Sequence, residues 1–92
     1  MYQLWGDLAL INIDRKTRRK IIAERMKCIR QLHKITQEEI SSVIDCNVFT
    51  YRGYENCKSD VPIVILIGLA DYYQVSMDYL TGRIDKYFVI YR

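Results

Sequence analysis

The densest group of charged side chains in the sequence is RKTRRK, residues 15–20, which holds five basic residues in six positions. Such a cluster can bind phosphate groups. It stands at the start of an expected helix, where positive charge opposes the helix dipole, and this favours a use beyond helix stability. A charged run can equally be a solvated face. The candidate phosphate contacts are Arg15, Lys16, Arg18, Arg19 and Lys20.

A second stretch, CNVFTYRGYENC, mixes apolar and polar side chains in a way that predicts a two-faced helix. One face carries Tyr51, Tyr54 and Glu55. The opposite face is the candidate contact surface with another molecule, and it offers Val48, Phe49, Arg52 and Gly53.

The other reactive side chains do not form a catalytic or metal-binding pattern. His33 falls on the apolar side of its expected helix, where a core or boundary role is typical. Cys28, Cys46 and Cys57 are an odd number without C-x-x-C spacing, which argues against disulfides and zinc and suits a reducing cytosol. The sequence contains no glycine-rich phosphate loop and no H-E-x-x-H motif. We therefore expect no enzyme activity, no metal, no cofactor, and a cytoplasmic location.

Length and composition predict one soluble domain. The 92 residues can close one modest core, and 50% apolar with 27% charged residues is typical of a folded chain. The net charge of +3 permits a nucleic-acid partner without requiring one. The apolar start of the chain is interrupted by Asp7 and follows no basic region, so neither a signal peptide nor a membrane span is expected.

Periodicity and capping residues predict the first two helices. The first begins after Asp14, a suitable N-cap, and its inward-facing side chains recur at helical spacing: Ile22, Met26, Ile29 and His33. The second begins after Thr36, which has capping-box spacing to Glu39. Its apolar stripe is Ile40, Val43 and Ile44.

Two further helices are marked by their ends. A tight turn at residues 45–47 leads to a helix that Asn47 caps and that runs to about Asn56. A short helix near the end of the domain is capped by Ser76 and ended by Gly82.

The run after Pro62 is rich in β-branched residues and could be a strand. A helix is favoured because Pro62 suits a first helical turn, with Ser59 or Asp60 as its cap. The core side of this helix would be Ile63, Leu66, Leu69 and Ala70. A second apolar face, suited to a partner, would then carry Ile65, Gly68 and Tyr72.

Both ends of the chain have the composition of β-strands. One candidate strand is residues 8–13, and the other comprises Tyr87, Phe88, Val89, Ile90 and Tyr91. Each alone would be an exposed edge, and pairing within one chain or across a dimer would cover both. We expect an N-terminal extension over 1–14, a helical domain over 15–83 and a tail over 84–92.

Five short helices, two of them joined by a three-residue turn, describe a helix-turn-helix domain. The sequence resembles the phage-repressor and Cro-like (XRE) helix-turn-helix family. The likeness is carried, in register, by TQEEI (36–40), YEN (54–56) followed by Lys58, and LADYYQVSMDYLTGR (69–83). It covers residues 22–83. The resemblance implies an all-α, five-helix, lambda-repressor-like domain that binds double-stranded DNA, with short strands at the ends as an addition.

The resemblance also implies roles for single residues. Gln37 would contact a phosphate and steady the recognition helix. Arg30 and Glu55 would form an ion pair between the first and third helices, either as a scaffold or to aim Arg30 at a phosphate. Asn56 and Lys58 would contact the DNA backbone.

The base-edge positions of the family fall on Val48, Phe49 and Gly53, which lack side-chain hydrogen-bonding groups. We expect Val48 and Phe49 to pack on thymine methyl groups, while Thr50 and Arg52 reach a phosphate or a base edge. Alternatively, Val48 and Phe49 cover a protein surface. The expected contact set of this helix is Asn47, Val48, Phe49, Thr50, Arg52 and Gly53.

Two residues depart from the family pattern, which often has glycine after the first helix and after YEN. Lys34 and Cys57 occupy these places. Either residue in a left-handed conformation would cost about 1–2 kcal/mol, unless the loops follow another path.

The leading interpretation is a DNA-binding regulator that inserts the helix 47–56 into the major groove. A homodimer, formed through Ile65, Tyr72 or the C-terminal strand, would favour half-sites about 34 Å apart. The alternative is a protein-interaction module of the same fold, antitoxin-like, that uses the Val48 and Phe49 surface.

Overall fold

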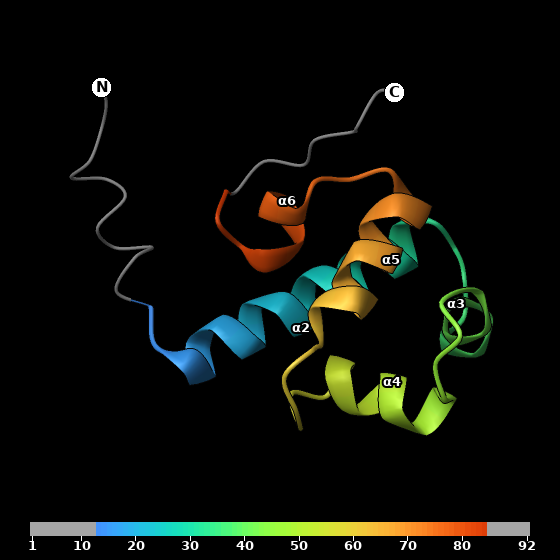
Figure 1. Ribbon diagram of the computed structural model, residues 1–92, viewed down its shortest axis with the longest axis horizontal. Coiled ribbons are helices and arrows are strands. Elements are labelled where there is room, and N and C mark those ends of the chain that lie inside the picture. The colour runs from blue at the N-terminus through green and yellow to red at the C-terminus, as the bar shows by residue number, and fades with distance from the viewer. Residues whose placement is uncertain (1–12, 85–92) are drawn as a thin grey trace.

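The computed structural model describes residues 13–84, and these form an all-α helix-turn-helix domain (Figure 1). Among the described residues there are five helices and no strand. The candidate strands at the two ends lie, apart from Ile13, outside the described residues. The helices are α2 (Arg15–Leu32), α3 (Gln37–Val43), α4 (Val48–Glu55), α5 (Ile63–Tyr73) and α6 (Met77–Thr81).

The predicted N-caps of four helices are present. The Asp14 carboxylate accepts a hydrogen bond from the Thr17 amide at 2.7 Å, and Thr36 and Glu39 form a reciprocal capping box. The Asn47 side chain accepts from two amides at the start of α4, and Ser76 accepts from an amide of α6. These bonds satisfy amides that no helical carbonyl can reach, so they fix where each helix begins.

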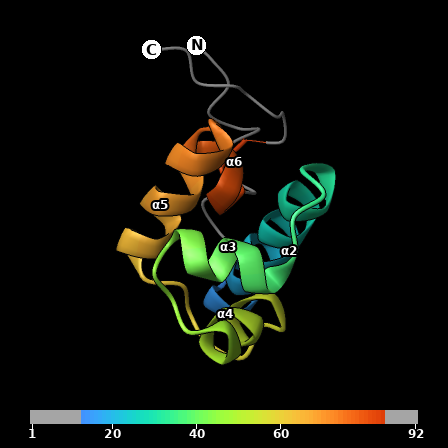
Figure 2. The ribbon, with the colours of Figure 1, turned by 90° about the vertical axis from the view of Figure 1, so that its right-hand side faces the viewer.

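The core lies where α2, α4, α5 and α6 meet, with α3 closing one end. Figure 2 shows α2 and α5 on opposite sides of the molecule and α4 at its lower end, below α3. Tyr51 from α4 is completely buried at the centre. The other fully buried large side chains are Met26, Ile29, Ile40, Leu69, Leu80 and Val75.

Helix α5 is a helix as predicted, but its start and its faces differ from the prediction. Pro62 itself is the N-cap, and neither Ser59 nor Asp60 caps the helix. Ile63, expected in the core, is 61% exposed. Ile65, expected on an outer face, packs against the core, and the Cα of Gly68 faces Ile44.

The cause of this error is that α5 is apolar on most of its surface, so helical spacing alone cannot select the buried stripe. The large apolar residues of α5 that face solvent are Ile63, Val64, Ile67 and Tyr72. Val43 of α3 was likewise expected in the core and is 51% exposed, whereas the other two members of its predicted stripe, Ile40 and Ile44, turn inward.

Lys34 and Cys57 take the left-handed conformation that glycine would favour, with φ of 55° and 61°. In each loop the two amides after the helix bond back to its last carbonyls, as in a Schellman motif. The Ile35 amide, for example, donates to the Arg30 carbonyl at 3.3 Å. The backbone therefore follows the usual helix-ending path, although a side chain stands at each strained position.

None of the described helices combines the length and the apolar content needed to cross a membrane.

Candidate nucleic-acid interface

The helix-turn-helix unit consists of α3, a short turn and α4. The turn depends on Asp45, which adopts a left-handed conformation with φ of 55° and lets the Cys46 amide bond back to Ser41 at 2.8 Å. Asn47, the next residue, is the N-cap of α4. Figures 1 and 2 both place α4 at the lower edge of the molecule, where its outer side faces no other helix.

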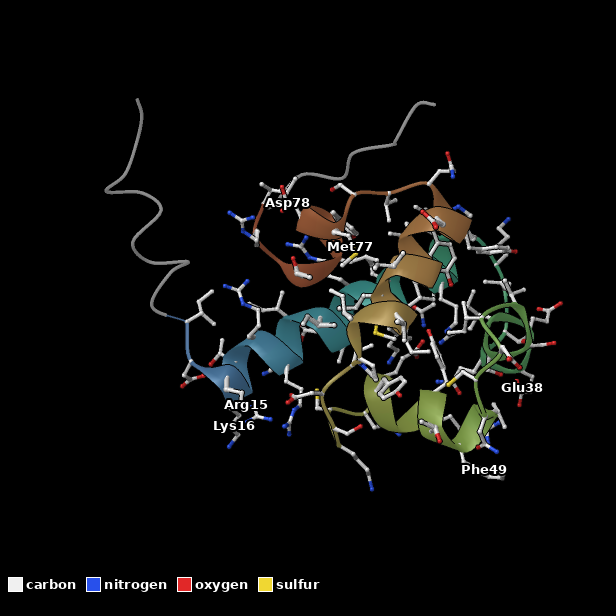
Figure 3. The ribbon with its side chains drawn as sticks, in the orientation of Figure 1. Arg15, Lys16, Glu38, Phe49, Met77 and Asp78 are labelled. Atoms are coloured by element: carbon white, nitrogen blue, oxygen red, sulfur yellow. The ribbon has the colours of Figure 1, made fainter. Side chains whose placement is uncertain are left out.

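The two faces of α4 are divided as the sequence predicts. Tyr51, Tyr54 and Glu55 are buried. On the opposite face, Phe49 is 73% exposed, and Figure 3 shows it at the lower edge, pointing away from the domain. Thr50 is also exposed, whereas the partly exposed members of this face are Val48, Arg52 and Gly53.

Glu55 joins three helices through one carboxylate. Its oxygens accept from Arg30 Nε at 2.8 Å and Nη2 at 3.1 Å, from Gln37 Nε2 at 2.9 Å and from Tyr51 Oη at 2.5 Å. The Glu55 side chain is only 2% exposed. The expected pair of Arg30 and Glu55 is thus present, and Gln37 joins it from α3. This network fixes the angle of α4 against α2 and α3.

The network also sets the ionisation of its members. Burial alone would raise the pKa of Glu55, but the hydrogen bonds from Arg30, Tyr51 and Gln37 outweigh it and hold that pKa below its usual value. The hydrogen bond to Glu55 raises the pKa of Arg30. Burial, and then the bond to Glu55, raises the pKa of the Tyr51 hydroxyl. Glu55 and Arg30 therefore stay charged at neutral pH.

Arg52 is held by a group that the sequence interpretation missed. Its Nη2 donates to the Glu38 carboxylate and its Nε to Gln37 Oε1, the latter at 3.2 Å. The guanidinium lies over the Phe49 ring, 5.5 Å from its centroid. Figure 3 shows Glu38 and Phe49 at the same corner of the molecule. Glu38 gave no local signal, because the residue that it contacts lies on another helix.

The basic cluster at the start of α2 divides into two groups. Arg15 and Arg19 both pair with Asp60, with Arg19 Nε 2.8 Å from Asp60 Oδ1, and Arg18 Nη1 donates to the Thr81 carbonyl at 2.8 Å. Lys16 and Lys20 are exposed and form no ion pair with the described residues. The two lysines are thus the better placed of the five for an outside phosphate.

This basic end of α2 adjoins the loop that follows α4. An open groove of about 650 Å³ runs between them, lined by Arg15, Lys16, Thr17, Arg19, Lys20 and Cys57. Lys58 and Asn56 are exposed on the same loop, and Lys58 Cβ lies 4.0 Å from the position of a Cβ on Gly53. Cations therefore flank the C-terminal end of α4, while Phe49 lies in its first turn and Arg52 in its last.

His33 caps the C-terminal end of α2, where its Nδ1 lies 3.0 Å from the Ile29 carbonyl oxygen and its ring packs on Tyr73. Cys28, Cys46 and Cys57 are free thiols. Within residues 13–84, no cluster of three or more histidine, cysteine or acidic side chains could hold a metal ion.

The fold and the α3–α4 geometry define a helix-turn-helix domain. The chain is 36% identical over 62 residues to YobD of Bacillus subtilis (strain 168), which is described as an uncharacterized HTH-type transcriptional regulator. The similar stretch covers 67% of this chain and 55% of YobD, so the chain spans little more than half the length of that relative. No protein-family model matches the chain, and no solved structure matches it.

Proposed function

We propose that this protein is a DNA-binding transcriptional regulator of the phage-repressor and Cro-like (XRE) type. It acts in the cytoplasm on double-stranded DNA and prefers certain sequences. The helix-turn-helix fold and the similarity to an HTH-type transcriptional regulator support this function.

The observation that carries the proposal is the outer face of α4. Phe49 and Arg52 stand on a helix whose inner face is locked by Tyr51 and Glu55. Phe49 is exposed, and Arg52 stays partly exposed beside α3. The major groove of DNA, about 12 Å wide, admits one such helix. A helix held rigidly with its outer face free can enter that groove without rearrangement.

Contacts to the DNA divide by type along this surface. Val48 and Phe49 pack on thymine methyl groups in the groove. The surrounding polar residues contact the backbone and position the helix without reading bases. This second group comprises Gln37, Asn47, Thr50, Asn56, Lys58, Lys16 and Lys20.

The protein binds DNA as a homodimer in this proposal, and the exposed face of α5 forms the contact. Ile63, Val64 and Ile67 present three neighbouring apolar side chains to solvent, with Tyr72 further along the helix. A twofold dimer would bind half-sites about 34 Å apart. Val64→Lys should convert a dimer to a monomer in sedimentation velocity runs, and an unchanged sedimentation coefficient would exclude this face as the contact.

Selection of bound duplexes from a random DNA pool tests the function directly. The expected result is an enriched motif rich in thymine, repeated with twofold symmetry, whose binding weakens steeply with salt. If the purified protein binds no duplex even at low salt, the proposed function is wrong.

The exposure of Phe49 favours a second candidate, a protein-interaction module. An apolar side chain that is 73% exposed is as suitable for a protein pocket as for a DNA groove. Phe49→Asp should release a stoichiometric partner protein if this candidate is correct. Binding of the unmodified protein to a selected duplex, with no co-purifying protein, would reject it.

A further inference from the structure

We propose that Arg52 and Phe49 together read a guanine that adjoins a thymine, and that Glu38 and Gln37 are positioning residues for Arg52. This inference rests on the proposed function, because it names the base step that α4 would recognise.

Arg52 is oriented on three sides before any DNA arrives. Gln37 accepts from its Nε, Glu38 accepts from its Nη2, and the Phe49 ring lies under the guanidinium. These contacts use two of its five N–H groups, and the others have no hydrogen-bond partner among residues 13–84. An arginine fixed in this way presents a two-pronged donor edge at little further entropic cost.

The acceptor that suits this edge is a base and not a phosphate. A phosphate approaching Arg52 would also approach the Glu38 carboxylate, and the two negative charges repel each other. The O6 and N7 atoms of guanine are uncharged acceptors spaced for a bidentate arginine. The Glu38 carboxylate therefore directs Arg52 away from the backbone and toward guanine.

The neighbouring base follows from the place of Phe49. Phe49 and Arg52 are three residues apart on α4, so they lie side by side on its surface and in contact. Two adjoining side chains on a helix in the major groove reach adjoining base pairs. Because Phe49 offers only apolar surface, the base that it prefers is thymine, through its methyl group.

Modified bases can test each contact on the unmodified protein. Starting from a selected duplex, 7-deazaguanine removes only the N7 acceptor, and uracil in place of thymine removes only the methyl group. We expect 7-deazaguanine at the read position to weaken binding about fivefold, and uracil at the adjoining position to weaken it about threefold.

Three variants connect these losses to named residues. In Arg52→Ala, which removes the donor edge, 7-deazaguanine should have no effect, and in Phe49→Ala uracil should have none. Glu38→Gln should bind unrelated DNA more tightly and discriminate guanine less. Glu24→Gln, the same charge change at an exposed site on α2, is the matched control and should keep the discrimination. Circular dichroism melting would confirm that each variant is folded.

The experiments distinguish failure of the proposed function from failure of this inference alone. If the unmodified protein binds no duplex, the proposed function and this inference fall together. If it binds but 7-deazaguanine weakens binding of the unmodified protein and of Arg52→Ala equally, Arg52 does not read guanine, and the inference alone is overturned. If Glu38→Gln and Glu24→Gln behave alike, Glu38 is not a positioning residue.

Discussion

Glu55 is a charged residue in a position where an isolated charge would be very costly. Its carboxylate is almost fully buried, and hydrogen bonds from four donor atoms of three residues stabilise its charge there. The same arrangement leaves Arg30 dependent on Glu55 for its own compensation. Removing either partner therefore costs more than the pair contributes as a whole.

Glu55→Gln should destabilise the fold by about 3 kcal/mol, because it leaves the Arg30 charge without its counter-charge. The same residue should make stability depend on pH. Since folding lowers the pKa of Glu55, its contribution is present above the pKa of the unfolded chain, about 4.3, and is lost as the pH falls through the lower folded value.

Urea unfolding at several pH values would measure both effects. Other carboxylates titrate in the same range, so the test is the difference between the two proteins. The gap in unfolding free energy between the unmodified protein and Glu55→Gln should narrow as the pH falls below 4. A gap that stays constant with pH would show that folding does not change the pKa of Glu55.

Sequence reasoning located this network in part. The resemblance to a known family supplied the pairing of Arg30 with Glu55 and a steadying role for Gln37. It did not supply Glu38, because Glu38 and Arg52 lie 14 positions apart on different helices and meet only after α3 and α4 have packed. Nor could it separate Lys16 and Lys20 from Arg15 and Arg19, since that division depends on where Asp60 lies.

The strained loop residues provide a second prediction at this scale. Lys34→Gly and Cys57→Gly should each stabilise the protein by about 1 kcal/mol, since glycine adopts a positive φ without a steric penalty. Lys27→Gly, in the middle of α2, is the control and should destabilise it by about 1 kcal/mol. Thermal melting of the three variants would measure these changes in stability. A loss of stability in Lys34→Gly would show that its loop is not strained.

At the level of elements, α4 is a helix of only eight residues, and its start depends on one side chain. Asn47 accepts hydrogen bonds from the amides of Phe49 at 2.8 Å and Thr50 at 3.3 Å. Short helices gain little from internal bonding, so such a cap contributes much of what holds the first turn. That first turn carries Val48 and Phe49, which links the cap to the proposed contact with DNA.

Asn47→Ala should therefore destabilise the fold by about 1 kcal/mol, whereas Asn47→Asp should retain stability, because aspartate caps equally well. The two variants should separate folding from binding. Asn47→Asp should fold normally but bind DNA more weakly, since it adds a negative charge beside the phosphates. Melting curves and fluorescence anisotropy would measure the two properties, and normal DNA binding by Asn47→Asp would place Asn47 away from the backbone.

The elements themselves were the most predictable part of the molecule. Asp14, Thr36, Asn47 and Ser76 are local signals, and the structure uses each one as an N-cap. The faces of α5 were not predictable, because an apolar helix can bury almost any side, and the packing of α6 and α3 makes the choice. Ile63 and Ile65 exchanged roles for this reason.

At the scale of the whole molecule, the basic start of α2 and the outer face of α4 can be tested as one DNA-binding edge. Figure 3 places Arg15, Lys16 and Phe49 along the lower edge and Asp78 near the top. Lys16→Ala and Lys20→Ala should each reduce the slope of log binding constant against log salt by about one. Arg83→Ala, which removes a cation that pairs with Asp78, should leave the slope unchanged.

Anisotropy titrations at four salt concentrations would give these slopes. If all three variants keep the slope of the unmodified protein, the start of α2 does not contact DNA. An effect of Arg83→Ala alone would place the DNA on the opposite edge.

The clamp that Asp60 forms on Arg15 and Arg19 has a consequence for the driving force of binding. The single Asp60 carboxylate already offsets one of the two positive charges of Arg15 and Arg19, so this pair can neutralise fewer phosphates and release fewer of the cations condensed on DNA. For this part of the surface, the gain in entropy from liberated ions would come mainly from the two lysines. Affinity should then decline more gently in concentrated salt than five cations in six positions would suggest.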